Sequence, residues 1–188
     1  MSLASRENEI KLSVSNIATA KRLLAANGFH IKRRRVFERN LVFDTPAREL
    51  RAGGKLLRLR QAGRRATLTF KGPASPGKHK SREEREARIA DLAEWQAILE
   101  RLGFIVSFIY EKYRTEFAQP AGEGVATLDE TPIGTFLELE GPPEWVDRVA
   151  AHLGYSEPDY ITLSYGALYQ NFRELAGKAE RDMCFPKR

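Results

Sequence analysis

The sequence predicts an α+β fold built mainly from antiparallel β-strands. About eight segments alternate apolar and polar residues with a period of two, which is the pattern of half-buried strands. Four other segments carry helix start and stop signals, and short joints that contain Gly or Pro separate several of the strands. A length of 188 residues fits one domain whose core is large enough to fold without a metal or a disulfide.

The alternating segments define the expected strands. They cover residues 6–14, 31–45, 55–62, 65–72, 80–90, 107–118, 124–130 and 134–141. Each places apolar residues on one face and polar residues on the other, so one face is expected to pack on a core.

Four helices are expected between these strands. The first covers residues 16–27, with Asn16 or Ser15 as its N-cap and Gly28 after its end. The others cover residues 91–102, 142–154 and about 164–176, where apolar residues recur at helical spacing. The basic segment 178–188 is expected to be a loosely attached tail.

The overall charge and the rare residue types narrow the class of protein. A formal net charge of +6 suggests an anionic partner: nucleic acid, a phosphate compound or a membrane surface. Cys184 is the only cysteine, which excludes a disulfide framework and favours a reducing, cytoplasmic location. The chain has no apolar run of transmembrane length, no apolar signal core at its start and no His/Cys spacing of a zinc enzyme. A membrane partner is therefore not expected.

Several of the strands carry like charges in pairs on a single face. Arg58 and Arg60 share a face opposite Leu57 and Leu59. The same doubling occurs in other strands: Glu7 and Glu9 with Lys11, Glu84 and Glu86 with Arg82, Lys112 with Arg114, and Glu138 with Glu140. Lys71 and Asp129 also lie on polar strand faces. Neighbouring like charges are unfavourable unless counter-charges are supplied.

These paired charges could act together in one binding site if the strands closed into a barrel. The charged faces would then line a shared interior, and the apolar faces would receive the helices outside. Arg and Lys suit phosphate groups, whereas Mg²⁺ and Mn²⁺ prefer carboxylate and phosphate oxygens. The pattern therefore indicates a tunnel that binds a polyphosphate together with a divalent cation.

Ordered motifs along the chain resemble those of the CYTH superfamily, also called the triphosphate tunnel metalloenzymes. Glu7-Asn8-Glu9-Ile10-Lys11 fits its ExExK motif. Further segments follow in the family's order: residues 40–46 (NLVFDTP), 57–60 (LRLR), 69–71 (TFK), 82–86 (REERE), 112–114 (KYR), 128–129 (LD), 134–140 (GTFLELE) and 164–165 (SY). The resemblance spans residues 5–175, and it places a CYTH domain at residues 1–177.

The resemblance implies an eight-stranded antiparallel barrel with a central tunnel and helices packed outside. By that resemblance, Mg²⁺ or Mn²⁺ would be held by Glu7, Glu9, Glu138 and Glu140, with Asp129 assisting. The triphosphate would be bound by Lys11, Arg58, Arg60, Lys71, Arg82, Lys112 and Arg114. Glu84 and Glu86 would position a second metal or an attacking water, with Lys11 also in a catalytic role. Whether Arg39 and Tyr165 face the tunnel stays open at this point.

The leading functional hypothesis is metal-dependent hydrolysis of a small-molecule triphosphate. The substrate would be inorganic triphosphate, or an organic one such as thiamine triphosphate or a nucleoside triphosphate. One alternative is a class IV adenylyl cyclase, which converts ATP to cyclic AMP and pyrophosphate. Another is a non-enzymatic polyphosphate or nucleic-acid binding protein, suggested by the basic run 32–35. Doubled carboxylates would repel a nucleic-acid backbone, so nucleic acid is not expected as a partner. The oligomeric state, monomer or homodimer, is left open.

Overall fold

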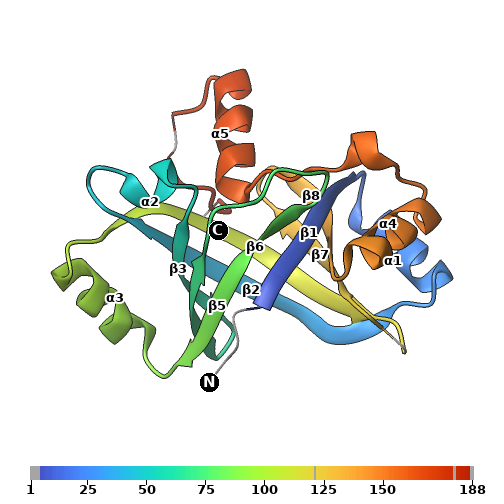
Figure 1. Ribbon diagram of the computed structural model, residues 1–188, viewed down its shortest axis with the longest axis horizontal. Coiled ribbons are helices and arrows are strands. Elements are labelled where there is room, and N and C mark those ends of the chain that lie inside the picture. The colour runs from blue at the N-terminus through green and yellow to red at the C-terminus, as the bar shows by residue number, and fades with distance from the viewer. Residues whose placement is uncertain (1–4, 121, 180, 187–188) are drawn as a thin grey trace.

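The computed structural model describes residues 5–120, 122–179 and 181–186. Within them the strands close into one antiparallel barrel, in the order β1-β5-β4-β3-β2-β6-β7-β8 (Figure 1). The strands are β1 (Ser5–Val14), β2 (His30–Asp44), β3 (Leu56–Ala62), β4 (Arg65–Lys71), β5 (Lys80–Ile89), β6 (Ile105–Ala118), β7 (Val125–Thr131) and β8 (Gly134–Glu140). The predicted eight-stranded antiparallel barrel is confirmed.

Four helices lie where the sequence predicted them. They are α1 (Ile17–Ala26), α3 (Leu92–Arg101), α4 (Pro143–His152) and α5 (Tyr165–Ala176). Side chains cap two of them as expected: Asn16 accepts from the Thr19 backbone N–H at 2.9 Å, and Asp91 accepts from that of Ala93 at 2.8 Å. A short helix α2 (Glu49–Ala52) and a 3₁₀ turn η1 (Glu157–Asp159) were not predicted.

The period-two pattern of each strand separates an apolar outer face from a polar inner face. On β1, Ile10 and Leu12 are fully buried under α1 and α4, where they pack with Leu24 and Trp145. On the opposite side of the barrel, Leu41, Phe43 and Leu59 pack with Leu99 of α3. A third cluster joins β6 and β8 to α5. The first two clusters therefore lie between the barrel and its helices, whereas the third reaches the cavity through Phe108 and Tyr110.

Asp44 connects the end of β2 to α2. Its carboxylate accepts from the backbone N–H groups of Thr45, Leu50 and Arg51 at 2.8–3.1 Å. One carboxylate thus satisfies amides at the start of the short helix, in a region with few other caps. This contact holds α2 beside one end of the barrel, where α5 also stands (Figure 1).

The end of the chain is attached more firmly than the sequence suggested. The Met183 side chain is fully buried, and its backbone bonds to Ile109 and Glu111 of β6 at 2.9 Å. The backbone N–H of Ile109 also donates to Asp182 at 2.9 Å. The expectation of a loose tail was wrong for residues 181–186, because an unpaired edge of β6 and an apolar socket for Met183 receive them. The predicted tail residues 180, 187 and 188 lie outside the described residues.

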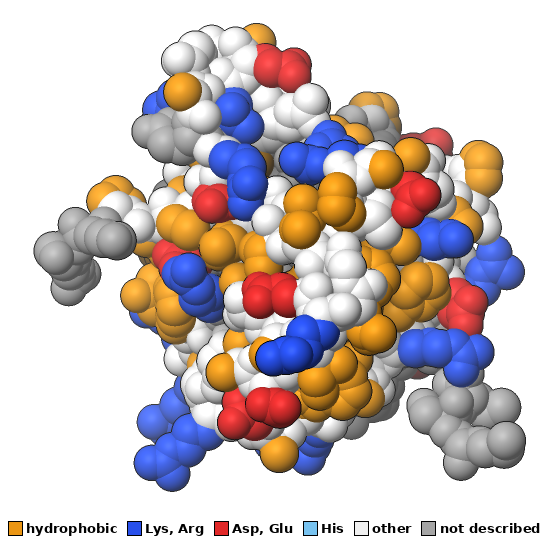
Figure 2. All heavy atoms as spheres, turned by 90° about the vertical axis from the view of Figure 1, so that its left-hand side faces the viewer, with side chains coloured by type: hydrophobic (Ala, Val, Ile, Leu, Met, Phe, Trp, Pro, Cys, Tyr) orange, Lys and Arg blue, Asp and Glu red, His pale blue; other side chains and the backbone are white. Residues whose placement is uncertain are grey.

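The outer surface carries charges of both signs. On the face that includes α3, basic and acidic side chains are scattered between hydrophobic ones (Figure 2). Ile98, Leu102 and Ile105 contribute exposed apolar surface around α3. Among the described helices, none is both long and apolar enough to span a membrane.

Candidate active site in the barrel

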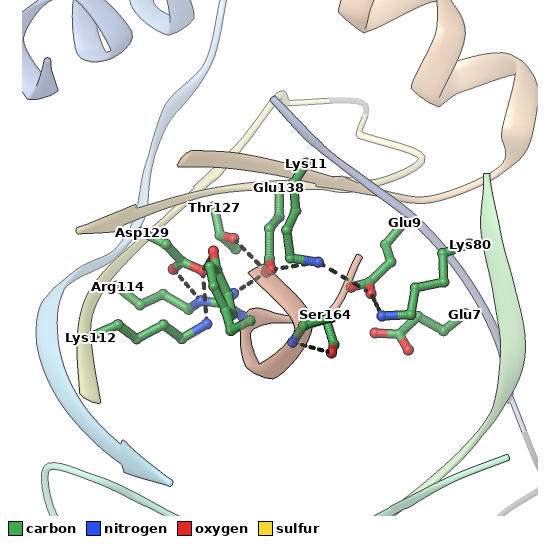
Figure 3. Close-up of polar contacts among 12 residues, drawn as sticks. Glu7, Glu9, Lys11, Lys80, Lys112, Arg114, Thr127, Asp129, Glu138 and Ser164 are labelled. Carbon is green, nitrogen blue, oxygen red and sulfur yellow. Dashed lines mark hydrogen bonds and ion pairs between the residues drawn. The ribbon is translucent and has the colours of Figure 1, made fainter. Parts of the chain in front are cut away.

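A cavity of about 1030 Å³ occupies the barrel and continues toward α2 and α5. Every sequence-predicted site residue except Asp129 lines it: Glu7, Glu9, Lys11, Arg58, Arg60, Lys71, Arg82, Glu84, Glu86, Lys112, Arg114, Glu138 and Glu140. They meet because alternate residues of each strand point inward. Figure 3 shows side chains from opposite walls of the barrel turned toward one another.

On the wall formed by β1, β4 and β5, acids and bases are paired. The Lys71 Nζ lies 2.6 Å from the Glu7 carboxylate and 3.0 Å from that of Glu84. Arg82 lies between Glu7 and Glu9, at 3.4 Å and 3.6 Å. These side chains are mostly buried, so their mutual attraction is only weakly screened by solvent.

The neighbouring wall repeats this arrangement around Glu138 and Asp129. Glu138 pairs with Lys11 at 3.3 Å and with the guanidinium of Arg114. Asp129 has no exposed surface, and it accepts from Lys112 at 2.7 Å, Arg114 at 2.6 Å and the Tyr165 hydroxyl at 2.7 Å (Figure 3). Asp129 therefore lies behind the cavity wall, where three donors surround it. Its predicted role as a metal ligand stays a prediction.

Glu38 is a buried acid that the sequence did not single out. Its carboxylate lies 3.6 Å from Arg60 and 3.8 Å from Lys112. Burial alone would raise the pKa of Glu38, but Arg60, Lys112 and Arg114 lower it to about 2. The sequence carried a usable signal: Glu38 has the opposite parity to Leu41 and Phe43, which pack outside the barrel.

Lys80 is a second residue of this kind. It lies at the start of β5 with the same parity as Arg82 and Glu84, and its Nζ is 3.0 Å from Glu9. Burial lowers the pKa of Lys80 to about 8, against the opposing effect of Glu9. Lys80 is thus a tunnel cation that is easier to deprotonate than a surface lysine.

Arg58 differs from the other tunnel bases. It is 6% exposed and, among the described residues, has no carboxylate within ion-pair distance. Its guanidinium donates to the Tyr110 hydroxyl at 3.0 Å and to the Thr69 hydroxyl at 3.3 Å, while its Nε has no partner within the described chain. A buried guanidinium without a counter-ion is suited to an anionic ligand.

Tyr110 and Tyr165 face the cavity, whereas Arg39 does not. Burial opposes ionisation of Tyr110, but Arg58, Arg60 and Lys112 lower its pKa to about 8. Tyr165 also lines the cavity, and the ammonium groups of Lys11 and Lys112 lie about 5 Å above its ring. Arg39 points outward and pairs with Glu111 at 2.5 Å.

The chemistry of the acids fits a hard divalent cation. Burial and the neighbouring carboxylates of Glu9 and Glu84 raise the pKa of Glu7. Partial desolvation, together with the carboxylates of Glu7, Glu84 and Glu9, raises the pKa of Glu140 to about 7, although Glu140 is an exposed residue at the end of β8. Carboxylates that crowd one another in this way are the oxygen donors that Mg²⁺ and Mn²⁺ use. In the described residues, however, no three acids lie close enough together to hold a metal ion, because Lys and Arg side chains pair with their carboxylates.

A closed barrel whose interior combines buried bases with crowded carboxylates is the arrangement that the sequence motifs predicted. The CYTH domain family matches residues 5–165 of this chain. A protein of Methanocaldococcus jannaschii named "putative adenylate cyclase" is 30% identical over 139 residues, which cover 71% of this chain and 75% of that protein. The chain belongs to the CYTH domain family.

Solved structures share the fold. A Vibrio parahaemolyticus protein described as a "putative adenylate cyclase" superposes with a TM-score of 0.77 at 24% identity, covering 89% of this chain and 99% of that one. A Hippeastrum adenylyl cyclase homologue, described as having a dominant triphosphatase activity, gives a TM-score of 0.66 at 22% identity, covering 88% and 96%. At these identities the likeness shows the fold alone.

Proposed function

We propose that this protein hydrolyses a triphosphate in a metal-dependent reaction within the barrel. The observation that carries the proposal is Arg58, a buried cation that faces the cavity and has no carboxylate partner in the described chain. An anionic group placed against its guanidinium would complete its hydrogen bonds. The dominant triphosphatase activity described for the Hippeastrum protein supports the same reaction class.

The tunnel bases would bind the phosphate chain and balance its charge. Arg58, Arg60, Lys112 and Arg114 approach from β3 and β6, while Lys11, Lys71 and Arg82 approach from β1, β4 and β5. Phosphoryl transfer depends mainly on such positioning and on neutralisation of charge, because the protein itself has little covalent chemistry to perform. The bases would stabilise the negative charge that spreads over the phosphate oxygens in the transition state.

The acids would have three separate roles. Glu7, Glu9, Glu138 and Glu140 would hold Mg²⁺ or Mn²⁺, which supplies neutralisation of phosphate oxygens when bound. Glu84 and Glu86 would orient a water for attack on the terminal phosphorus. The water oxygen would form a bond to that phosphorus as the anhydride P–O bond breaks, so that the diphosphate portion of the substrate is the leaving group. The attacked phosphoryl group would become orthophosphate, and one proton of the water would pass to a neighbouring carboxylate. Asp129, enclosed by Lys112 and Arg114, would position these bases.

Cyclisation of a nucleoside triphosphate is a second candidate, favoured by the name of the Methanocaldococcus relative. In that reaction the 3′-hydroxyl of the substrate would attack the α-phosphorus, and pyrophosphate would leave. The same bases would bind the phosphates, so the two reactions differ in which phosphorus faces the nucleophile.

Product analysis tests the proposal and separates the two reactions. The protein is incubated with inorganic triphosphate, thiamine triphosphate or ATP, with Mg²⁺ or Mn²⁺, and the release of orthophosphate and of pyrophosphate is measured. Hydrolysis is expected to release orthophosphate, whereas pyrophosphate with cyclic AMP would indicate a cyclase. The absence of both products with every substrate and metal would contradict an enzymatic role.

A matched pair of variants tests the acids. Glu9→Gln removes a tunnel carboxylate, and Glu130→Gln removes a carboxylate that pairs with Arg35 outside the tunnel. We expect Glu9→Gln to weaken Mn²⁺ binding in calorimetry and to lower the turnover at least about tenfold. Glu130→Gln should change neither. Wild-type turnover by Glu9→Gln would sink the assignment of the metal site.

A further inference from the structure

The start of β5 carries a tunnel base that the sheet holds on one side only. Lys80 is the first residue of this strand, and its Nζ lies 3.0 Å from the Glu9 carboxylate, with the two side chains turned toward each other (Figure 3). Strand β1 pairs with residues 80–84 of β5, whereas β4 pairs with residues 84–89. The backbone at Lys80 therefore has a ladder partner in β1 but none in β4, and both of these strands lie within the described chain.

The residue before Lys80 points the other way, out of the barrel. Successive residues of an extended chain direct their side chains to opposite faces. Lys80 lines the cavity, whereas the Nε2 of His79 lies 2.8 Å from the Oδ1 of Asp147 on α4. The His79 side chain is only 9% exposed. A rotation of the chain that withdrew Lys80 from the tunnel would therefore also break the contact between His79 and Asp147.

Asp147 brings three donors together outside the barrel. Besides His79, the Lys78 Nζ lies 2.8 Å from its Oδ2, and the Tyr160 hydroxyl donates to its Oδ1 at 3.2 Å. The rings of His79 and Tyr160 lie with their centroids 6.1 Å apart. Partial burial would raise the pKa of Asp147, but the hydrogen bonds from Lys78 and His79 lower it below its ordinary value. Asp147 is therefore an ionised acceptor that fixes the two residues directly before β5.

The groups that hold His79 are anchored independently of β5. On α4, the neighbours of Asp147 include Trp145 and Val146, which are buried in the core between the helices and the barrel. Ile161 follows Tyr160 in the chain, and it exchanges two backbone hydrogen bonds of 2.9 Å with Lys11 of β1. The start of β5 is thus tied through Asp147 to parts of the fold that do not depend on β5 for their own position.

The placement of Lys80 matters for the charge balance around Glu9. Of the bases beside Glu9 in the described chain, Lys80 is the nearest: its Nζ lies at 3.0 Å, whereas Lys11 lies at 3.5 Å and Arg82 at 3.6 Å. Both Lys80 and Glu9 are less than 9% exposed, so solvent does little to replace a lost partner. A displaced Lys80 would therefore change both the balance of charge at Glu9 and the place of one cation that lines the cavity.

We propose that Asp147 is a positioning residue for the tunnel, which acts through His79 to hold the Lys80 ammonium where it meets both Glu9 and a bound triphosphate. Asp147 is not among the residues that line the cavity, so it would touch no substrate itself. The inference rests on the proposed function. It adds Lys80 to the bases that bind phosphate, and it adds Asp147 as the residue that places Lys80.

A double-mutant cycle tests whether Asp147 acts through Lys80. The affinity for inorganic triphosphate in the presence of Mg²⁺ is measured by calorimetry for the wild-type protein, Asp147→Ala, Lys80→Met and the double variant. Lys80→Met keeps a long side chain without the ammonium, and it should weaken binding by roughly tenfold or more. Asp147→Ala should weaken binding by at least about threefold, because Lys80 then spends part of its time away from the phosphates. In the Lys80→Met background, Asp147→Ala should change the affinity by less than about twofold.

Arg148→Ala is the matched control. Arg148 is the next residue of α4, and its guanidinium lies 2.8 Å from Glu123, which belongs to the segment between β6 and β7. The replacement thus removes an equally close contact of the same helix that is not connected to β5. Arg148→Ala should leave the affinity for triphosphate within about twofold of the wild-type value. Urea denaturation of every variant shows that folded proteins are being compared.

The outcomes separate the positioning role from the proposed function. If Asp147→Ala weakens binding as much in the Lys80→Met background as in the wild-type protein, Asp147 acts independently of Lys80 and the inference is wrong. Wild-type affinity of Asp147→Ala, whatever its stability, overturns the inference without any change in the tunnel, so the test holds even if Lys80→Met does not fold. In both cases the wild-type protein still binds triphosphate, and the proposed function stands. If the wild-type protein binds no triphosphate, the proposed function fails, and the positioning role fails with it.

Discussion

Replacing Arg58 with Met would test whether the charge of Arg58 serves ligand binding and not the stability of the fold. Arg58 is 6% exposed and, in the described chain, forms no ion pair. Met keeps a long apolar side chain but removes the unpaired charge and two hydrogen bonds, to Tyr110 and Thr69. Each lost bond costs about 1 kcal/mol, and relief from burying an unpaired charge offsets it. We therefore expect the free energy of unfolding to change by less than about 1 kcal/mol.

Lys71→Met is the matched comparison, because Lys71 is equally buried but fully paired. Its Nζ lies 2.6 Å from Glu7 and 3.0 Å from Glu84, so removing it leaves two buried carboxylates without their cation. Breaking a buried pair on one side costs about 3–5 kcal/mol. Urea denaturation of both variants should therefore give clearly different midpoints.

Arg58→Met should weaken triphosphate binding even though it leaves the free energy of unfolding nearly unchanged. A hydrogen bond to a charged group contributes about 1.5–3 kcal/mol, so Arg58→Met should weaken the binding of inorganic triphosphate by roughly 10- to 150-fold. Isothermal titration calorimetry of the wild-type and variant proteins measures this difference directly. The reasoning would be refuted if Arg58→Met destabilised the protein as much as Lys71→Met does, or if it bound triphosphate with wild-type affinity.

Three further perturbations have defined outcomes. Above about pH 8 the Tyr110 hydroxyl should ionise and pair with Arg58, so the affinity for triphosphate should fall with rising pH. In Tyr110→Phe the affinity should fall less steeply. Identical pH profiles of the two proteins in calorimetry would argue against this pairing. Asp129→Asn should lower the free energy of unfolding by about 3–5 kcal/mol, because two buried cations lose their shared partner. Weaker Mn²⁺ binding at unchanged stability would instead assign Asp129 to a metal. Ending the chain before residue 181 removes the buried Met183 and should cost about 2–3 kcal/mol in urea denaturation, whereas a loose tail would cost nothing.

The architecture could be predicted because two periods alternate along the chain. Apolar and polar residues alternate strictly in β4 and over residues 57–60 of β3, and caps such as Asn16 and Asp91 mark where helices begin. The short helix α2 could not be predicted in this way. It has no side-chain cap of its own and depends on Asp44, which a sequence reading assigns to the preceding strand.

The direction of the β2 side chains shows where the sequence becomes ambiguous. Both faces of β2 carry charges, and shifts of register near Arg33, Val36 and Phe43 interrupt the alternation. Between these shifts the parity is regular, and Leu41, which packs under α3, places Arg39 outside the barrel and Glu38 inside it. Knowing that one apolar residue of β2, such as Leu41, packs outside the barrel would have settled which side chains of this strand point inward.

The partners of the tunnel residues could not be predicted from one strand at a time. Asp129 looks like another exposed acid of the charged faces, and only the pairing of β6 with β7 brings Lys112 and Arg114 to it. The docking of Met183 depends in the same way on a free edge of β6. The partners of Asp129 and the docking of Met183 depend on contacts between segments that are distant in the sequence. The periodicity within one strand does not predict such contacts.

The net charge of +6 is not what identifies the tunnel as the proposed site for anions. Between the barrel walls, the structure adds one acid, Glu38, and one base, Lys80, to the predicted residues, so the balance there is unchanged. Six further bases, with Asp44 and Glu174, also line the cavity. A nearly neutral interior explains how so many buried charges coexist before a ligand binds, since most of the tunnel acids lie beside a base: Glu7, Glu9, Glu38, Glu84, Asp129 and Glu138. A triphosphate alone would leave the displaced carboxylates unpaired, and a cation alone would leave the displaced ammonium and guanidinium groups unpaired. Only the two together replace every lost ion pair, so the charge balance of the tunnel itself favours their joint entry.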